Sequence, residues 1–149
     1  MTATGHALIG TAIAAKFGDP LLAIPIALVS HVIVDAIPHW DLFTHRREKT
    51  KQLLFVESVI DVLLGFALSY LMIKFLFPNT PLIYAFILII AAQLLDWLTV
   101  PYLILNMKYP PFTWAYKFQK LFDNKLDKPW GIIDQAAILG IIIFAARML

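Results

Sequence analysis

Two histidines and two aspartates lie close together in the string HVIVDAIPHWD, which runs from His31 to Asp41 at the end of a long apolar segment. His31 and Asp35 are four residues apart, so on a helix their side chains share one face and can reach the same ion. Pro38 should end that helix and allow His39 and Asp41 to fold back over the same face. Imidazole and carboxylate groups together are typical ligands of zinc, manganese or iron. The string therefore predicts a metal site.

Further ionisable residues occur in the other apolar segments. Glu57 and Asp61 repeat the spacing of four, His6 lies near the start of the chain, and Asp96 lies inside an apolar run. Such groups are costly at membrane depth, by roughly 2.5–3.5 kcal/mol each on insertion scales, and are usually functional there. The site could hold one ion, or two ions about 3.5–4 Å apart, with zinc the first choice. The predicted metal ligands are His6, His31, Asp35, His39, Glu57, Asp61 and Asp96.

Two further carboxylates are candidates for a catalytic role outside the ligand set. Asp41 follows the histidine-containing string, and Asp134 opens the last apolar segment. A carboxylate beside a metal site can act as a general base. His45 is followed directly by Arg46 and Arg47, a context that indicates a solvated loop residue.

The composition is that of an integral membrane protein. Of 149 residues, 60% are hydrophobic and only 15% are charged, whereas a soluble domain carries about 25% charged residues. A net charge of +2 gives no reason to expect a nucleic-acid partner, and the lack of cysteine excludes disulfides and thiolate ligands. No basic region precedes the first apolar stretch, so no cleaved signal peptide is expected.

The apolar segments predict an all-α membrane bundle in a single domain, 1–149. They lie at about 5–17, 20–38, 53–77, 81–106 and 130–149, and the last four are long enough to cross a hydrocarbon core of about 30 Å. The expected fold is therefore one short N-terminal helix and four spanning helices. An interfacial amphipathic helix is expected between the last two, where apolar residues recur at helical spacing: Trp114, Phe118, Leu121 and Phe122.

Basic residues predict the orientation of this bundle. The loops after the second and fourth apolar segments are rich in lysine and arginine, and the short Pro78-Asn79-Thr80 connection has neither. If each long segment crosses once, both basic loops lie on one side, which should be the cytoplasmic side of a prokaryotic inner membrane. All the candidate ligands then fall within about 15 Å of that side, at 1.5 Å per residue. Unrelated hydrogen bonds between helices would be expected at various depths, so a shared depth favours a common site.

The opening MTATGHALIG, with His6, resembles the start of the bacterial membrane-bound metal-dependent hydrolases, the family that includes a LexA-regulated inner-membrane protein. The resemblance covers about the first 60 residues and extends to Asp35, His39 and Asp41, although the order here is VDAIPHWD. The spacing of His31, Asp35 and His39 is also similar to a short motif of zinc-dependent phospholipases C. Both resemblances imply a helical metal-dependent hydrolase, and the second implies a phosphoester substrate.

These observations favour a membrane-bound metal-dependent hydrolase. A phosphoesterase acting on a lipid or lipid-linked phosphate is expected, because the polar layer lies at the depth of lipid headgroups and the basic loops could attract a phosphate. One alternative is an ion or proton transporter that uses the carboxylates as a relay, which predicts ionisable groups across the whole membrane. Another is a non-enzymatic scaffold with a structural metal, which predicts a closed site without a cavity.

Overall fold

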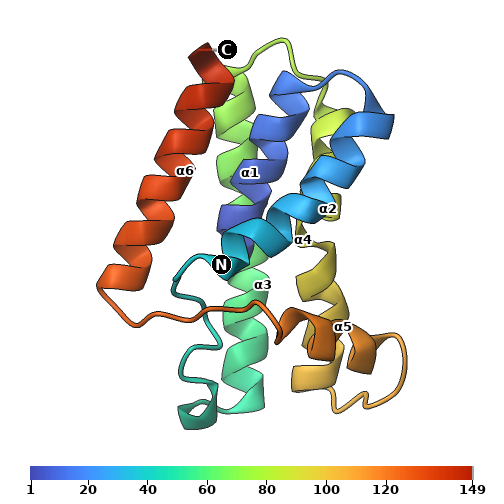
Figure 1. The fold of residues 1–149 in the computed structure, drawn as a ribbon, viewed down its shortest axis with the longest axis vertical. Helices are drawn as coiled ribbons and strands as arrows, with labels where there is room; N and C mark the ends of the chain where they lie inside the picture. The colour runs from blue at the N-terminus through green and yellow to red at the C-terminus, as the bar shows by residue number, and fades with distance from the viewer. Residues whose placement is uncertain (149) are drawn as a thin grey trace.

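The computed structural model describes residues 1–148, and these form an all-helical bundle without strands (Figure 1). The helices lie close to the predicted segments, because most begin at a capping residue or a proline; Thr2, for example, caps α1 through its side chain. The elements in chain order are α1 (Ala3–Lys16), α2 (Pro20–Ala36), the 3-10 turn η1 (Arg46–Glu48), α3 (Lys51–Leu76), α4 (Leu82–Ile104), α5 (Phe112–Gln119) and α6 (Trp130–Met148).

Three of these helices, α3, α4 and α6, are long and apolar enough to cross a membrane. The prediction of four spanning helices is wrong for α2, which has only 17 residues. That length corresponds to about 26 Å, short of a core of about 30 Å. Asp19 caps the start of α2 through its side chain, and Pro38 prevents the helix from continuing past Ala36.

Helix α1 is a short wedge between α3 and α4. Its N-terminus lies near the middle of the bundle in Figure 1, and the helix runs from there to the upper end. The backbone of α1 lies close to α3 and α4. A Cβ atom added at Gly10 would lie 2.8 Å from the Leu88 carbonyl oxygen, and one added at Gly65 would lie 3.1 Å from Ala7 Cβ. Small residues allow this packing. Below the N-terminus of α1, α3 and α4 continue without the wedge between them.

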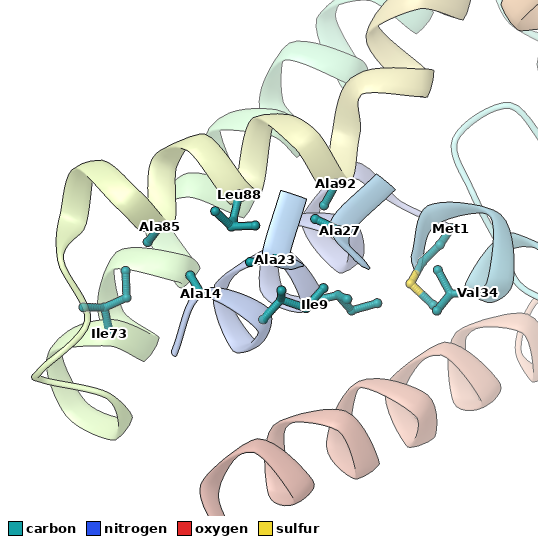
Figure 2. Close-up of a cluster of buried hydrophobic side chains, with 11 residues drawn as sticks. Met1, Ile9, Ala14, Ala23, Ala27, Val34, Ile73, Ala85, Leu88 and Ala92 are labelled. Atoms are coloured by element: carbon teal, nitrogen blue, oxygen red, sulfur yellow. The ribbon is translucent and has the colours of Figure 1, made fainter. Parts of the chain in front are cut away.

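The apolar core is formed by residues of α1, α2, α3 and α4, together with Met1 (Figure 2). Ile9 of α1 and Leu88 of α4 are the largest apolar side chains that are fully buried. Most of the others are alanines, which bring the helices into close contact. The alanines of this cluster are Ala14, Ala23, Ala27, Ala85 and Ala92.

The lower end is covered by α5 and two loops. Tyr116 of α5 stacks on Tyr102 of α4, with ring centroids 4.2 Å apart, while Trp114 and Phe118 expose large apolar surfaces. The helix is amphipathic, as expected, but it ends at Gln119, so that Leu121 and Phe122 of the predicted apolar face lie beyond it. The segment after α5 then returns beside the end of α2, where His39 donates its N–H to Asn124 at 3.0 Å.

Candidate metal centre

Four of the predicted ligands meet in one cluster at the N-terminus of α1: His6, His31, Asp35 and Asp96. They come from α1, α2 and α4, and each offers a ligand atom within 4.8 Å of the others. Asp35 lies 3.2 Å from His6 Nε2 and 3.3 Å from His31 Nε2, using one carboxylate oxygen for each ring. Asp96 lies 3.8 Å and 3.7 Å from the same two nitrogen atoms.

A second cluster shares Asp35 and adds His39 and Asp123. His39 Nε2 lies 3.8 Å from Asp35 Oδ1 and 3.4 Å from Asp123 Oδ1. As expected from Pro38, the chain turns after α2 and brings His39 back to the face of Asp35. Because Asp35 belongs to both clusters, its two oxygens could bridge two ions.

Hydrogen bonds to the backbone define the tautomers of two of these histidines. His31 Nδ1 lies 2.7 Å from the Ala92 carbonyl oxygen, and His39 Nδ1 lies 2.9 Å from that of Ile37. A carbonyl oxygen only accepts, so each Nδ1 carries a proton, and in the neutral ring Nε2 presents a lone pair. Each lone pair faces carboxylate oxygens. Metal-binding histidines are held in this way, with the remote ring nitrogen bound to a backbone carbonyl or a carboxylate.

The nitrogen–oxygen distances fit ligands that share an ion better than direct hydrogen bonds. A charge-assisted N–H···O bond is about 2.7–2.9 Å long, whereas the pairs in the two clusters span 3.2 Å to 3.8 Å. Two ligand atoms about 2.0–2.2 Å from a tetrahedral ion lie about 3.3–3.6 Å from each other. A cation between the nitrogen lone pairs and the carboxylates would also relieve their mutual repulsion.

Several buried polar atoms of the clusters lack a hydrogen-bond partner among the described residues. They include both ring nitrogens of His6, Nε2 of His39 and Oδ1 of Asp123. A buried polar group without a partner costs about 1–3 kcal/mol, so a water or an ion bonded to these four atoms would stabilise the region. The donor set of imidazole and carboxylate fits a divalent transition metal.

Other polar groups contact the carboxylates. Gln119 at the end of α5 donates to Asp96 Oδ1 at 2.8 Å, and the Met1 nitrogen contacts Asp35 Oδ1. Lys125 lies 3.4 Å from Asp123 Oδ2. The Lys125 ammonium favours the ionised form of the Asp123 carboxylate.

Glu57 and Asp61, two of the predicted ligands, lie outside both clusters. Asp61 accepts from the backbone N–H groups of Ala3 and Thr4, at 2.7 Å and 3.2 Å, and from the Thr4 hydroxyl at 2.7 Å. It therefore anchors the first turn of α1, where helix amide groups have no partner of their own. Glu57 forms an ion pair with Lys49 at 2.6 Å. Both carboxylates are engaged by protein groups rather than directed at the histidines.

The two candidate bases also lie outside the clusters. Asp41 accepts from Lys125 at 2.8 Å and from the Phe43 amide at 2.9 Å, so it stabilises the turn that follows α2. Asp134 is half-buried in the first turns of α6. His45 is exposed and pairs with Asp127 at 2.9 Å, as expected for a loop residue.

Sequence patterns do not single out Asp123 or Gln119. Neither stands at a regular spacing from the other ligands, and both lie in or just after α5 rather than in an apolar segment. Their approach depends on backbone pairing between the ends of α2 and α5, where Asn124 donates to Asp35 O at 2.9 Å and Leu126 donates to His39 O at 2.7 Å. A polar residue beside an amphipathic helix is too common a pattern to predict this pairing.

A cavity of about 500 Å³ opens beside the clusters. Asp96, Asp123 and Gln119 form one part of its wall, so both clusters have a carboxylate that reaches it. Asp41 also lines the cavity, whereas Asp134 is not among the lining residues. This volume lies within the range of small-molecule sites, about 300–1,000 Å³.

No protein-family model, curated protein or solved structure matches the chain.

Proposed function

We propose that this protein is a membrane-bound metal-dependent hydrolase whose metal centre is formed by the two clusters around Asp35. The observation that carries the proposal is the pair of ring nitrogens, His31 Nε2 and His39 Nε2, whose lone pairs face carboxylates across 3.3–3.8 Å. His6, Asp96 and Asp123 complete the ligand set. Zinc is the first choice, with manganese or iron as alternatives.

A divalent ion bound here would polarise a phosphoryl oxygen and lower the pKa of a coordinated water toward about 7. The protein's own part is to hold the ligands in place. The carbonyls of Ala92 and Ile37 fix two imidazole rings, and Gln119 orients Asp96. Asp41 lines the same cavity and stays a candidate general base. A phosphoester is the proposed substrate class, because charge on a phosphate suits both a metal ion and the basic residues nearby.

The cavity supports an enzyme over a structural metal site. A purely structural site is closed, while a catalytic site keeps a position open to water and substrate. Here Asp96 and Asp123 belong to the clusters and also line the cavity. We further propose that this end of the bundle faces the cytoplasm, because both basic loops lie there.

The test compares two histidines in the purified protein. His31→Ala should lose bound metal, measured by elemental analysis, and hydrolysis of p-nitrophenyl phosphate. His45→Ala, which alters an exposed histidine outside both clusters, should keep the bound metal. Asp96→Asn is a second variant with less risk of misfolding, since its side chain is partly exposed. Absence of zinc, manganese and iron from the wild-type protein, or full activity in both His31→Ala and Asp96→Asn, would overturn the proposal.

A further inference from the structure

Two kinds of side chain line the cavity beside the metal centre. The first wall carries cationic side chains from the loop after α2 and from the end of α5: Arg46, Arg47 and Lys120. The second side comes from α3 and α4 and is mixed, with the polar residues Ser58, Asp61, Asp96 and Thr99 beside four apolar residues, here called the apolar wall: Val62, Trp97, Val100 and Leu103. A small polar substrate would need only the first wall. The second suggests that an apolar group also enters.

The cations of the first wall are available for an anionic ligand. Among residues 1–148, no carboxylate lies within 4.0 Å of the charged nitrogens of Arg46, Arg47 or Lys120. Arg46 instead contacts the Tyr116 hydroxyl at 3.4 Å. By contrast, Lys125 on the same cavity is engaged by Asp41 and Asp123. Three cations without an acidic partner beside a carboxylate-rich cluster fit a ligand with a strongly charged phosphate.

The apolar wall exists because α1 is short. Above its N-terminus α1 separates α3 from α4, and below it the two spanning helices continue to the lower end of the bundle (Figure 1). Met1, Thr2 and Ala3, at the start of α1, also line the cavity. The outer side of α3 at this level is strongly apolar, with Ile60 and Leu63 exposed as they would be to lipid. The cavity therefore lies between two helices that the bilayer itself would surround.

We propose that the substrate is a lipid with a terminal phosphate, which enters sideways from the bilayer between α3 and α4. Its phosphate lies beside Arg46, Arg47 and Lys120, next to Asp96 and Asp123 of the metal centre. Its acyl chain lies along Val62, Val100 and Leu103. The inference rests on the proposed function for the chemistry, but the binding site itself can be tested without hydrolysis.

The experiment uses a phosphonate analogue of phosphatidic acid that resists hydrolysis and carries a photoreactive diazirine in its acyl chain. The full-length protein is reconstituted in phosphatidylcholine vesicles containing this probe, irradiated, and digested to map the labelled residues. We expect label on the cavity wall, at Val62, Val100 or Leu103. Excess unlabelled long-chain phosphonate should remove it, and a short-chain, water-soluble phosphonate should not.

Two pairs of variants test the two walls separately. Val62→Trp should fill the space for the chain and lower labelling about tenfold, whereas Leu63→Trp, the next residue and 62% exposed, should not. Arg47→Gln should lower labelling by a similar factor through loss of a charge-assisted contact, whereas Lys117→Gln, an exposed lysine outside the cavity, should not.

The outcomes separate this inference from the proposed function. Label confined to the outward residues Ile60 and Leu63, or equal competition by the short-chain phosphonate, would overturn lipid entry even if the protein hydrolyses p-nitrophenyl phosphate. Label on the cavity wall with the expected variant pattern would support the lipid site even if no phosphatase activity is found.

Discussion

Two pairs of side chains with the same spacing have different surroundings in this protein. His31 and Asp35 on α2 are four residues apart, and so are Glu57 and Asp61 on α3. Both pairs lie in the same half of the bundle. The first pair belongs to a buried cluster with unsatisfied nitrogen and oxygen atoms, while the second is fully engaged by a lysine and a helix terminus.

The difference lies in the groups that each pair meets. The α2 pair faces other histidines and carboxylates, an arrangement in which a bound cation would relieve the repulsion between ring lone pairs and anions. The α3 pair meets donors that already carry protons: the Lys49 ammonium and the amide groups of Ala3 and Thr4. Spacing places two side chains on one face, but the neighbouring elements decide whether they need an ion.

The largest effect is expected from Asp35→Asn, because Asp35 belongs to both clusters. Loss of its charge should lower metal affinity by more than about a hundredfold, since even residues that only support a ligand change affinity by 10- to 100-fold. Elemental analysis after dialysis measures the metal that remains. A variant that kept the wild-type metal content would show that the α2 pair is not a ligand pair.

Asp61→Ala should give the second largest effect, on stability and not on metal. It removes a carboxylate that accepts from two backbone amides and a hydroxyl at the start of α1. We expect a loss of about 2–3 kcal/mol in the free energy of unfolding, because these bonds involve a charged acceptor and partly buried donors. Denaturation in detergent followed by circular dichroism measures it, and metal content serves as the control. Loss of metal in the stably folded variant would place Asp61 among the ligands after all.

Glu57→Gln should change less, because the ion pair with Lys49 is partly exposed. Such pairs contribute about 0–1 kcal/mol. Stability and metal content should both remain close to those of the wild type in the same assays. A large fall in bound metal would mean that the two carboxylates of α3 act together at the metal centre.

The smallest effect concerns His45, the one exposed histidine. Its bond with Asp127, and then the charges of Asp127 and Glu48, raise its pKa above 6.5. A raised pKa means that the stabilisation is present below about pH 6.5 and is lost as the pH rises through the folded-state value. The pKa of Asp127 is lowered, by the Lys128 backbone N–H and by His45, so its contribution is lost in acid.

The corresponding experiment is a comparison of wild-type protein and His45→Gln across pH. The difference between their thermal midpoints should be greatest near about pH 5–6 and should vanish in alkaline solution. Metal content should not differ at any pH. A difference that grows as the pH rises would contradict the direction of the His45 pKa shift.

Much of the fold follows from the sequence, and the exceptions have clear physical causes. The helix positions follow from long apolar runs ended by prolines and polar turns, which are local properties. The number of spanning helices does not follow from the sequence in this way. Helix α2 ends at Ala36, and its 17 residues are about one turn too short to cross the hydrocarbon core of a bilayer. Five of the seven predicted ligands, including His6 and Asp96, do enter the clusters.

The sequence by itself determines which side chains could act as metal ligands and which helix face carries them. It also determines the turn at Pro38 and the apolar character of α3, α4 and α6. Only the tertiary structure decides which of the candidate ligands meet. Asp123 lies beside His39 and Asp35 because the backbone after α5 pairs with the end of α2. Asp61 lies outside both clusters because it accepts hydrogen bonds from the start of α1. These are contacts between residues 57 to 89 positions apart, and local periodicity carries no information about them.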